Sequence, residues 1–272
     1  MNNKSLQRSN GFFQIGSARL EYSFHDCGNS NRPLLVLLHE GLGSVRMWRD
    51  YPQELALASN CSTLVFSRRG YGNSSPYSAP WPLSYMHEEA LEILPQVLDA
   101  AGADNAIMVG HSDGASIALI HAGDTLDNRV AALVLMAPHV FCEPISVAGI
   151  RQAKEKYLRG ELRSVLEKYH GANVDNAFWG WNNAWLDPGF FEWSIERYLP
   201  QIRIPLLLIQ GEEDEYGTLR QLQVIAAQTT GTVDKLVLPG CGHSPHRDKK
   251  EETILAICQF IDRVSLSGKL TP

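Results

Sequence analysis

Short apolar runs alternate with longer amphipathic stretches through the first half of the chain. Four of these runs are almost wholly apolar: Pro33–Leu38, Ser62–Phe66, Ala106–Gly110 and Val130–Met136. Runs of this length and composition are typical of strands that are buried on both faces of a parallel sheet. Helices are predicted between them, over Trp48–Ala58, Leu83–Ala101 and Gly114–Ala122. A hairpin is predicted ahead of the first run, over Phe12–Ile15 and Ala18–Phe24.

The alternation stops between about residues 141 and 200. Four consecutive helical patterns fill this segment with no strand between them: Val147–Leu158, Glu161–Tyr169, Val174–Leu186 and Phe190–Leu199. Strands and helices then alternate again, over Pro205–Gln210, Gly217–Ala227, Thr232–Pro239 and Lys249–Val264. The helical segment also holds four of the six tryptophans.

Strands that alternate with helices predict an α/β fold with a mostly parallel sheet and helices on both faces. We therefore expect one core domain made of residues 1–140 and 201–272. The all-helical segment 141–200 is expected to form a cap inserted in that core. Such a cap would cover the strand ends, where sheets of this kind bind ligands.

Composition narrows the class of protein. The 272 residues are 44% hydrophobic and 20% charged, with a formal net charge of −6 and no basic cluster, so a nucleic-acid partner is not expected. Five cysteines without a CxxC pair argue against a disulfide framework and favour a cytoplasmic location. We predict neither a membrane span nor a signal peptide, because no apolar run is long enough. The expected partner is a small-molecule substrate, and the oligomeric state, monomer or homodimer, stays open.

The strongest chemical signal is a G-x-S-x-G motif. Gly110, Ser112 and Gly114 form it between a predicted strand and a predicted helix, which is the context that this motif requires. The glycines permit a tight, strained turn that lifts the serine hydroxyl above the sheet edge. The following helix directs backbone N–H groups at the place where negative charge would develop. The sequence therefore predicts Ser112 as a nucleophile.

A serine is a poor nucleophile unless a neighbouring base accepts its proton. We predict His243 as that base, because it lies in a glycine-flanked loop just after the last predicted strand. His246 is the near rival, but Arg247 and Asp248 after it suggest the solvated start of a helix. Asp214, in the turn after the preceding strand, is the predicted acid that orients the histidine.

The loop His39–Gly43 follows the first predicted strand of the sheet. One N–H group from such a loop and one from the residue after the nucleophile can together stabilise an oxyanion. We assign these donors to Gly41 and Asp113. Each donor of this kind lowers the reaction barrier by about 3 kcal/mol in comparable enzymes.

These segments together resemble the α/β-hydrolase superfamily over nearly the whole chain. LLVLLHEGLGS resembles its oxyanion loop, RGYGNS its R-G-x-G-x-S segment, and GHSDG its nucleophile elbow. GEEDEYG and GCGHSPH resemble its acid and histidine loops, so that Ser112, Asp214 and His243 follow the family's chain order. The sequence is most similar to the short-capped esterase and valacyclovir-hydrolase-like branch, in which an aspartate also follows the serine.

Two positions depart from the family's pattern. Glu40 stands where the family usually has glycine, which leaves the loop geometry, and Gly41 as a donor, open. Ser67 stands where aspartate is frequent, and we expect only local hydrogen bonding to change. No metal site is predicted, because neither histidine–glutamate pair belongs to an HExxH motif. No cofactor is expected, since the sequence has no P-loop and no GxGxxG after the first strand.

The predicted chemistry is acyl transfer to water through an acyl-enzyme on Ser112. The expected substrate is a small, apolar or aromatic carboxylic ester, with thioesters and lactones as variants of the same chemistry. Five residues are candidates for the substrate pocket: Leu42, His139, Trp179, Trp181 and Trp185.

Several alternatives stay open at this point. Glu40 and Asp113 would favour an amine-bearing substrate if their carboxylates faced the pocket. A carbon–carbon bond hydrolase acting on a ring-cleavage product would use the same fold. A catalytically inactive hydrolase fold serving as a ligand receptor is a third interpretation, against which the intact serine, aspartate and histidine argue.

Overall fold

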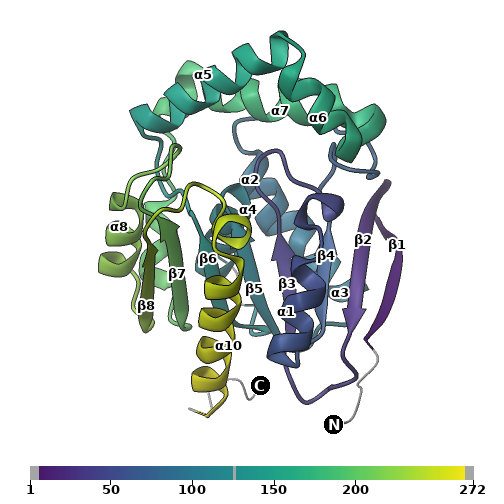
Figure 1. Ribbon diagram of the computed structural model, residues 1–272, viewed down its shortest axis with the longest axis vertical. Coiled ribbons are helices and arrows are strands. Elements are labelled where there is room, and N and C mark those ends of the chain that lie inside the picture. Colours follow the sequence, from purple (N-terminus) through teal and green to yellow (C-terminus); the bar gives the residue numbers. More distant parts are fainter. Residues whose placement is uncertain (1–5, 125–126, 267–272) are drawn as a thin grey trace.

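A computed structural model describes residues 6–124 and 127–266, and it is built around one eight-stranded sheet. The strand order is β1-β2-β4-β3-β5-β6-β7-β8. β2 pairs antiparallel with both β1 and β4, and all other neighbours are parallel. Figure 1 shows helices on both faces of this sheet and a further layer of helices above it. The predicted α/β fold with a mostly parallel sheet is therefore confirmed.

The central strands coincide closely with the apolar runs of the sequence, whereas β1 begins at Gln7, ahead of the predicted Phe12. Their bounds are β1 Gln7–Ile15, β2 Ala18–Asp26, β3 Leu34–Leu38, β4 Thr63–Phe66, β5 Ala106–His111, β6 Val130–Met136, β7 Leu206–Gly211 and β8 Val233–Leu238. Alternate residues of the central strands pack on opposite faces. In β5, Ile107 and Val109 belong to one apolar cluster, whereas Ala106 and Met108 belong to the other. The continuous apolar runs thus serve two separate layers of the core.

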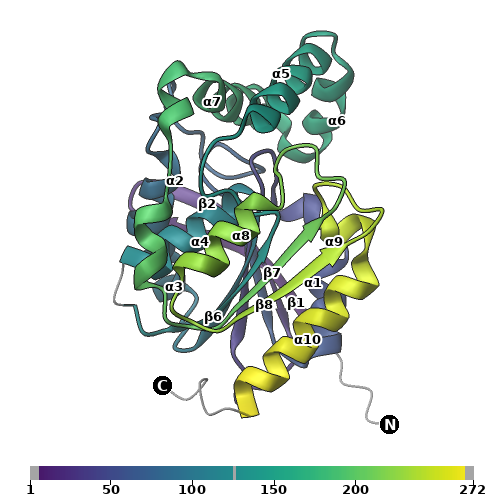
Figure 2. The same ribbon diagram turned by 90° about the vertical axis from the view of Figure 1, so that its left-hand side faces the viewer.

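Two sets of helices cover the two faces of the sheet. Their bounds are α1 Tyr51–Ser59, α2 Tyr85–Glu88, α3 Leu94–Ala100, α4 Asp113–Asp124, α8 Arg220–Gln228, α9 Pro245–Asp248 and α10 Lys250–Leu266, with the 3₁₀ helix η1 Val45–Trp48 before α1. α1 and α10 pack on one face, and α3, α4 and α8 on the other (Figures 1 and 2). Among the helices of residues 6–124 and 127–266, none is long and apolar enough to cross a membrane.

The helix predicted over Leu83–Ala101 is divided into three pieces. A π-helical turn, η2 Glu89–Ile93, joins α2 to α3. Pro95 in the first turn of α3 has no N–H to donate to the preceding turn, and this missing hydrogen bond accounts for the wider turn before it. Tyr85 of α2 is buried, and its hydroxyl donates to Asp113 at the start of α4.

The segment between β6 and β7 carries three helices that lie together above the carboxyl ends of the strands (Figure 1). They are α5 Pro144–Leu158, α6 Glu161–His170 and α7 Val174–Leu186, with the short 3₁₀ helix η3 Gly171–Asn173 between the last two. The predicted helix over Phe190–Leu199 is wrong, because two 3₁₀ helices, η4 Pro188–Glu192 and η5 Glu196–Gln201, stand there. Ser194 between them forms a β-bridge with Phe141, and Pro200 interrupts the helical hydrogen bonding.

Side-chain hydrogen bonds connect α7 and the residue before it to the sheet-bearing part of the chain. Asn173 Nδ2 donates to the carbonyls of Gly72 and Ser74, at 3.1 and 2.7 Å. Asn176 Nδ2 donates to the carbonyl of Tyr77 at 2.7 Å. Further along the helix, the Trp185 indole N–H donates to the Tyr85 hydroxyl at 3.0 Å. These contacts fix α7 near both of its ends.

Candidate active site

Ser112 lies in the turn between β5 and α4, at the carboxyl end of the sheet. Its φ is +53°, a left-handed conformation that costs a residue other than glycine about 1–2 kcal/mol. The turn is held because the Ser112 N–H donates to the Met136 carbonyl at 2.9 Å. The Ser112 carbonyl in turn accepts from the Ala115 N–H at 2.8 Å. Neighbouring strands and helix therefore impose the strained turn that the motif predicted.

Both glycines of the motif stand where a side chain would collide with backbone. A Cβ atom on Gly110 would lie 2.6 Å from Cα of Ala115, and one on Gly114 would lie 2.1 Å from the Leu38 carbonyl oxygen. The first turn of α4 consequently packs directly against β5 and β3. This close approach places the positive end of the helix dipole beside Ser112.

The side chains of Ser112, His243 and Asp214 form one hydrogen-bonded chain. Ser112 Oγ lies 2.9 Å from His243 Nε2, and His243 Nδ1 lies 2.8 Å from Asp214 Oδ1. An ionised carboxylate only accepts hydrogen bonds, so Nδ1 carries the ring proton and Nε2 is left to accept from the serine. The structure thus brings together the three residues that the sequence singled out.

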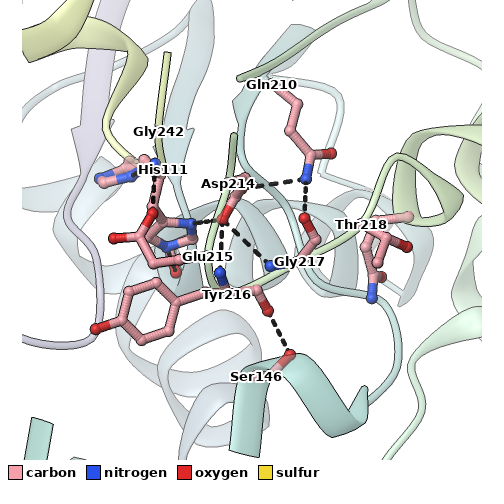
Figure 3. Close-up of polar contacts among 12 residues, drawn as sticks. His111, Ser146, Gln210, Asp214, Glu215, Tyr216, Gly217, Thr218 and Gly242 are labelled. Atoms are coloured by element: carbon pink, nitrogen blue, oxygen red, sulfur yellow. Dashed lines mark hydrogen bonds and ion pairs between the residues drawn. The ribbon is translucent and has the colours of Figure 1, made fainter. Parts of the chain in front are cut away.

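Asp214 is buried, and its carboxylate has four hydrogen-bond donors (Figure 3). Oδ1 accepts from His243 and from the backbone N–H groups of Tyr216 and Gly217, the latter two at 2.9 and 3.2 Å. Oδ2 accepts from the Gln210 amide at 3.1 Å. Burial alone would raise the pKa of Asp214, but the charge and hydrogen bond of His243 lower it below its ordinary value. The carboxylate is therefore ionised and fixed in orientation.

The main chain of His243 is held on both sides. Its N–H donates to Glu215 Oε2 at 3.2 Å, and its carbonyl accepts from His111 Nε2 at 2.7 Å. Burial disfavours the imidazolium form, but the charge and hydrogen bond of Asp214 outweigh it and raise the pKa of His243 above its ordinary value. Sequence reasoning assigned no role to Glu215 or His111, whose only signal was their position beside a predicted site residue.

The rival histidine, His246, does not reach the serine. It is buried rather than solvated, and its ring lies 4.7 Å from the Trp48 ring and 4.8 Å from the His111 ring. Burial lowers the pKa of His246 well below its ordinary value, so this imidazole is neutral. The short helix α9 turns it inward, which the charged residues after it did not indicate.

The loop after β3 is held by its carbonyl groups. Arg68, which is 2% exposed, donates to the carbonyls of the two residues before Gly41. His170 Nε2 lies 2.9 Å from the carbonyl of Leu42. Gly41 itself borders the cavity beside Ser112. A Cβ atom there would lie 2.1 Å from the indole nitrogen of Trp181, so the loop and α7 approach as closely as a glycine allows.

The other predicted donor, Asp113, is the first residue of α4, and its side chain is fully buried. Its Oδ2 accepts from the Tyr85 hydroxyl, which also accepts from Trp185. Burial raises the pKa of Asp113, while the charge of Arg68 opposes the rise. Glu40 Oε2 lies 3.4 Å from a ring nitrogen of His111. Each carboxylate therefore has a contact within the protein, and both residues also border the cavity beside Ser112.

A cavity of about 180 Å³ opens beside Ser112, beneath the helices α5 to α7. Leu42, His139, Trp181 and Trp185 line it, together with further apolar side chains of α5 and α6. The prediction that Trp179 lines it is wrong, because Trp179 borders a separate pocket beside Pro80 and Trp81. Trp181 and Trp185 share one face of α7, and Trp179 points about 200° away from Trp181 around the helix axis.

Within the described residues, no group of three or more histidine, cysteine, aspartate and glutamate side chains is arranged to hold a metal ion. The cysteines, all five of which lie in the described ranges, are free thiols. His139 beside the cavity is buried, and burial together with the charge of His243 lowers its pKa to about 3. It therefore contributes a neutral ring to the cavity wall.

Comparison with known proteins agrees with this architecture. Residues 35–256 match the alpha/beta hydrolase family, and the chain belongs to that family. It is 28% identical over 203 residues to Carboxylesterase YbfK of Bacillus subtilis (strain 168), a match covering 69% of this chain and 66% of the esterase. It is 23% identical over 275 residues to an sn-1-specific diacylglycerol lipase, ABHD11, of Xenopus laevis, covering 89% of this chain and 84% of the lipase.

Solved structures share the fold at lower identity. The 2-hydroxy-6-oxo-6-phenylhexa-2,4-dienoate hydrolase of Rhodococcus sp. strain RHA1 superposes with a TM-score of 0.74 at 17% identity, covering 94% of this chain and 99% of its own. The enol-lactonase of Burkholderia xenovorans LB400 superposes with a TM-score of 0.72 at 18% identity, covering 93% of this chain and 100% of the lactonase. At these identities the likeness establishes the fold alone. The chain is a hydrolase-family protein whose substrate must be argued from its own site.

Proposed function

We propose that this protein is a serine hydrolase that cleaves small carboxylic esters through an acyl-enzyme on Ser112. The observation that carries the proposal is the continuous hydrogen bonding from Ser112 Oγ through His243 to Asp214. A serine gains nucleophilicity only when a base is in contact with its hydroxyl, and here that base is oriented by an ionised acid. A fold serving only as a ligand receptor has no need of this arrangement.

In the proposed reaction, His243 Nε2 accepts the Ser112 proton as Oγ attacks the substrate carbonyl carbon. The oxyanion that forms accepts hydrogen bonds from the N–H groups of Gly41 and Asp113. His243 then gives its proton to the leaving oxygen, and the acyl group stays on Ser112. Water repeats the sequence with His243 as base, which releases the acid and restores the serine.

The cavity limits the substrate that we propose. About 180 Å³ is little more than the 150 Å³ or so of an engineered apolar cavity that accommodates benzene. Trp181, Trp185 and aliphatic side chains of α5 and α6 make its walls apolar. An acyl group of a few carbons, or a single aromatic ring, matches this space. Thioesters and lactones differ only in the leaving group and remain within the proposal.

The helical segment 141–200 is proposed to act as the cap of this site, since α5, α6 and α7 all contribute residues to the cavity. Similarity to Carboxylesterase YbfK supports an ester substrate. The engagement of Glu40 and Asp113 within the protein leads us to expect equal kcat/KM for an amino-acid ester and its uncharged analogue.

Labelling with a fluorophosphonate probe tests the nucleophile directly. We expect the protein to be labelled stoichiometrically and Ser112→Ala to be unlabelled with an unchanged melting temperature. A panel of p-nitrophenyl esters, from acetate to octanoate and with phenylacetate, then tests the substrate class. The proposal requires kcat/KM to be highest for short or single-ring acyl groups. Turnover of a vinylogous diketone but of no ester would establish the carbon–carbon hydrolase instead.

A further inference from the structure

Two tryptophans of α7 border the cavity beside Ser112, and their indole N–H groups differ. Trp185 donates its N–H to the Tyr85 hydroxyl at 3.0 Å, so this donor is already used within the protein. Trp181 forms no side-chain hydrogen bond within residues 6–124 and 127–266, and its indole nitrogen is not fully buried. An indole nitrogen only donates hydrogen bonds. The cavity wall therefore offers a donor that is free to bind a substrate oxygen.

The edge of the Trp181 ring that carries this N–H faces Gly41. A Cβ atom on Gly41 would lie 2.1 Å from Nε1, 2.3 Å from Cδ1 and 2.9 Å from Cε2 of Trp181, so the contact is made by the nitrogen-bearing ring of the indole. Gly41 is one of the two proposed oxyanion donors, and it borders the same cavity as Ser112. The free N–H thus lies on the side of the cavity where the substrate carbonyl oxygen would gain negative charge.

Both sides of this contact are held in place. The hydrogen bonds described above fix α7 near both of its ends, and Trp181 lies between them. The ring of Phe178 meets the ring of Trp181 edge-on, with their centres 6.2 Å apart and their planes at 62°. Across the contact, Arg68 and His170 hold carbonyl groups of the loop after β3. A donor that is fixed before the reaction stabilises developing charge without reorganising at that moment.

We propose that the Trp181 indole N–H is a third hydrogen-bond donor to the oxyanion, supplied by the helical segment 141–200. This inference rests on the proposed function. An alkoxide oxygen has three lone pairs, so it can accept from the indole as well as from the N–H groups of Gly41 and Asp113. The indole keeps its proton throughout and contributes only this hydrogen bond. Trp181 is then a catalytic residue, and the oxyanion site is complete only while α7 lies over the sheet.

Trp181→Phe tests the donor, because it keeps an aromatic side chain and removes the N–H. Removing an oxyanion donor lowers kcat by about 10²–10³ in comparable enzymes. We expect Trp181→Phe to lower kcat for p-nitrophenyl acetate at least about tenfold, with KM little changed. A parental kcat would overturn the proposal. A raised KM with a parental kcat would overturn it too, because the indole would then bind the substrate only in the ground state.

The matched control is Trp179→Phe, which removes an indole N–H from the same helix. Trp179 borders the separate pocket beside Pro80 and Trp81 and does not line the cavity beside Ser112. Its replacement should leave kcat and KM at the parental values. An equal loss of kcat in Trp179→Phe and Trp181→Phe would assign both losses to the packing of α7 and overturn the donor role.

Trp181→Phe also removes ring volume, and a thionoester separates this effect from loss of the donor. In a thionoester, sulfur replaces the carbonyl oxygen, and sulfur is a weak hydrogen-bond acceptor. Loss of a donor should therefore slow hydrolysis of the ester more than hydrolysis of the matching thionoester. We expect the ratio of the two kcat/KM values to fall in Trp181→Phe and to stay parental in Trp179→Phe. An unchanged ratio in Trp181→Phe would assign its loss of activity to packing and refute the third donor.

A covalent adduct tests the contact without turnover. A fluorophosphonate bound to Ser112 places a phosphonyl oxygen at the oxyanion position. In protein labelled with ¹⁵N-tryptophan, the indole proton resonance of Trp181, assigned by comparison with Trp181→Phe, should move downfield on phosphonylation. Its shift should exceed those of Trp179 and Trp185, and its exchange with solvent should become slower.

The adduct also distinguishes failure of this inference from failure of the proposed function. If Ser112 is phosphonylated and the Trp181 resonance stays in place, the third donor is refuted and the serine hydrolase remains. If the probe does not label the protein at all, the proposed function is refuted, and the inference that rests on it is refuted as well.

Discussion

Replacing Arg68 by lysine tests how the oxyanion loop is held. The guanidinium is buried and spans two carbonyl oxygens, those of His39 and Glu40. The Glu40 carbonyl keeps two other donors, the His39 ring and the Gly43 N–H, but Arg68 supplies the hydrogen bond to the His39 carbonyl. A lysine ammonium keeps the charge but cannot reproduce the planar fork.

The expected cost follows from these contacts. A hydrogen bond to a charged group contributes about 1.5–3 kcal/mol, so losing one of the two should reduce the free energy of unfolding of Arg68→Lys by about 2 kcal/mol. Removing an oxyanion donor outright lowers kcat by about 10²–10³, and a displaced loop should cost part of this, at least tenfold. KM should change little, because the oxyanion forms only after the bound substrate has been attacked and so does not contribute to substrate binding.

The assay is hydrolysis of p-nitrophenyl acetate combined with urea unfolding. Arg69→Lys is the matched control. The guanidinium carbon of Arg69 lies 4.9 Å from the centre of the Tyr77 ring, and this side chain does not touch the loop carbonyls. We expect the free energy of unfolding of Arg69→Lys to fall by less than about 1 kcal/mol and its kcat to stay at the parental value. If Arg68→Lys has the parental kcat and stability, the loop does not depend on the guanidinium fork and our reasoning is refuted.

Three further results are expected. Asp214→Asn should lower kcat by about 10⁴, as in other serine hydrolases with this arrangement, and a loss below tenfold would exclude Asp214 as the orienting acid. In the pH profile of kcat/KM, the inflection on the acid side should lie above pH 6.5, because Asp214 raises the pKa of His243. Only the neutral imidazole accepts the Ser112 proton, so activity should fall as His243 becomes protonated. In Asp214→Asn that inflection should move to lower pH, and an unchanged position would assign the limb to another group. Gly114→Ala, whose new Cβ would lie 2.1 Å from the Leu38 carbonyl oxygen, should lose about 1–3 kcal/mol in thermal unfolding, whereas an unchanged melting temperature would contradict the tight packing of α4.

The parts of the site that follow strands were predictable from the sequence. Apolar runs mark the parallel strands, and all parallel strands end at the same edge, so residues just after them converge. Ser112, Asp214 and His243 each follow such a run. The G-x-S-x-G motif predicted the turn at Ser112 as well. Its two glycines are needed because a side chain there would collide with the backbone of Ala115 or Leu38.

The parts that depend on side-chain contacts between distant segments were not predictable. Periodicity indicated that α7 is helical but not which face turns to the cavity, and Trp179 was assigned to the wrong side. Nothing local marks Arg68 as the support of a loop 28 positions earlier. His111 and Glu40 acquire partners only when three loops meet.

Anchoring of α7 has a consequence for how substrate enters. Asn173, Asn176 and Trp185 tie that helix to the body of the molecule at both of its ends. A swing of all three upper helices about one hinge would have to break these bonds together, including the bond that reaches the Tyr85–Asp113 pair. The α5–α6 hairpin is tied as well, because Ser146 donates to the Tyr216 carbonyl and His170 of α6 contacts the Leu42 carbonyl and accepts from the Gly72 N–H. All three upper helices are thus attached to the sheet-bearing part of the chain at separate points, so moving them aside as one body would be a costly route for substrate entry.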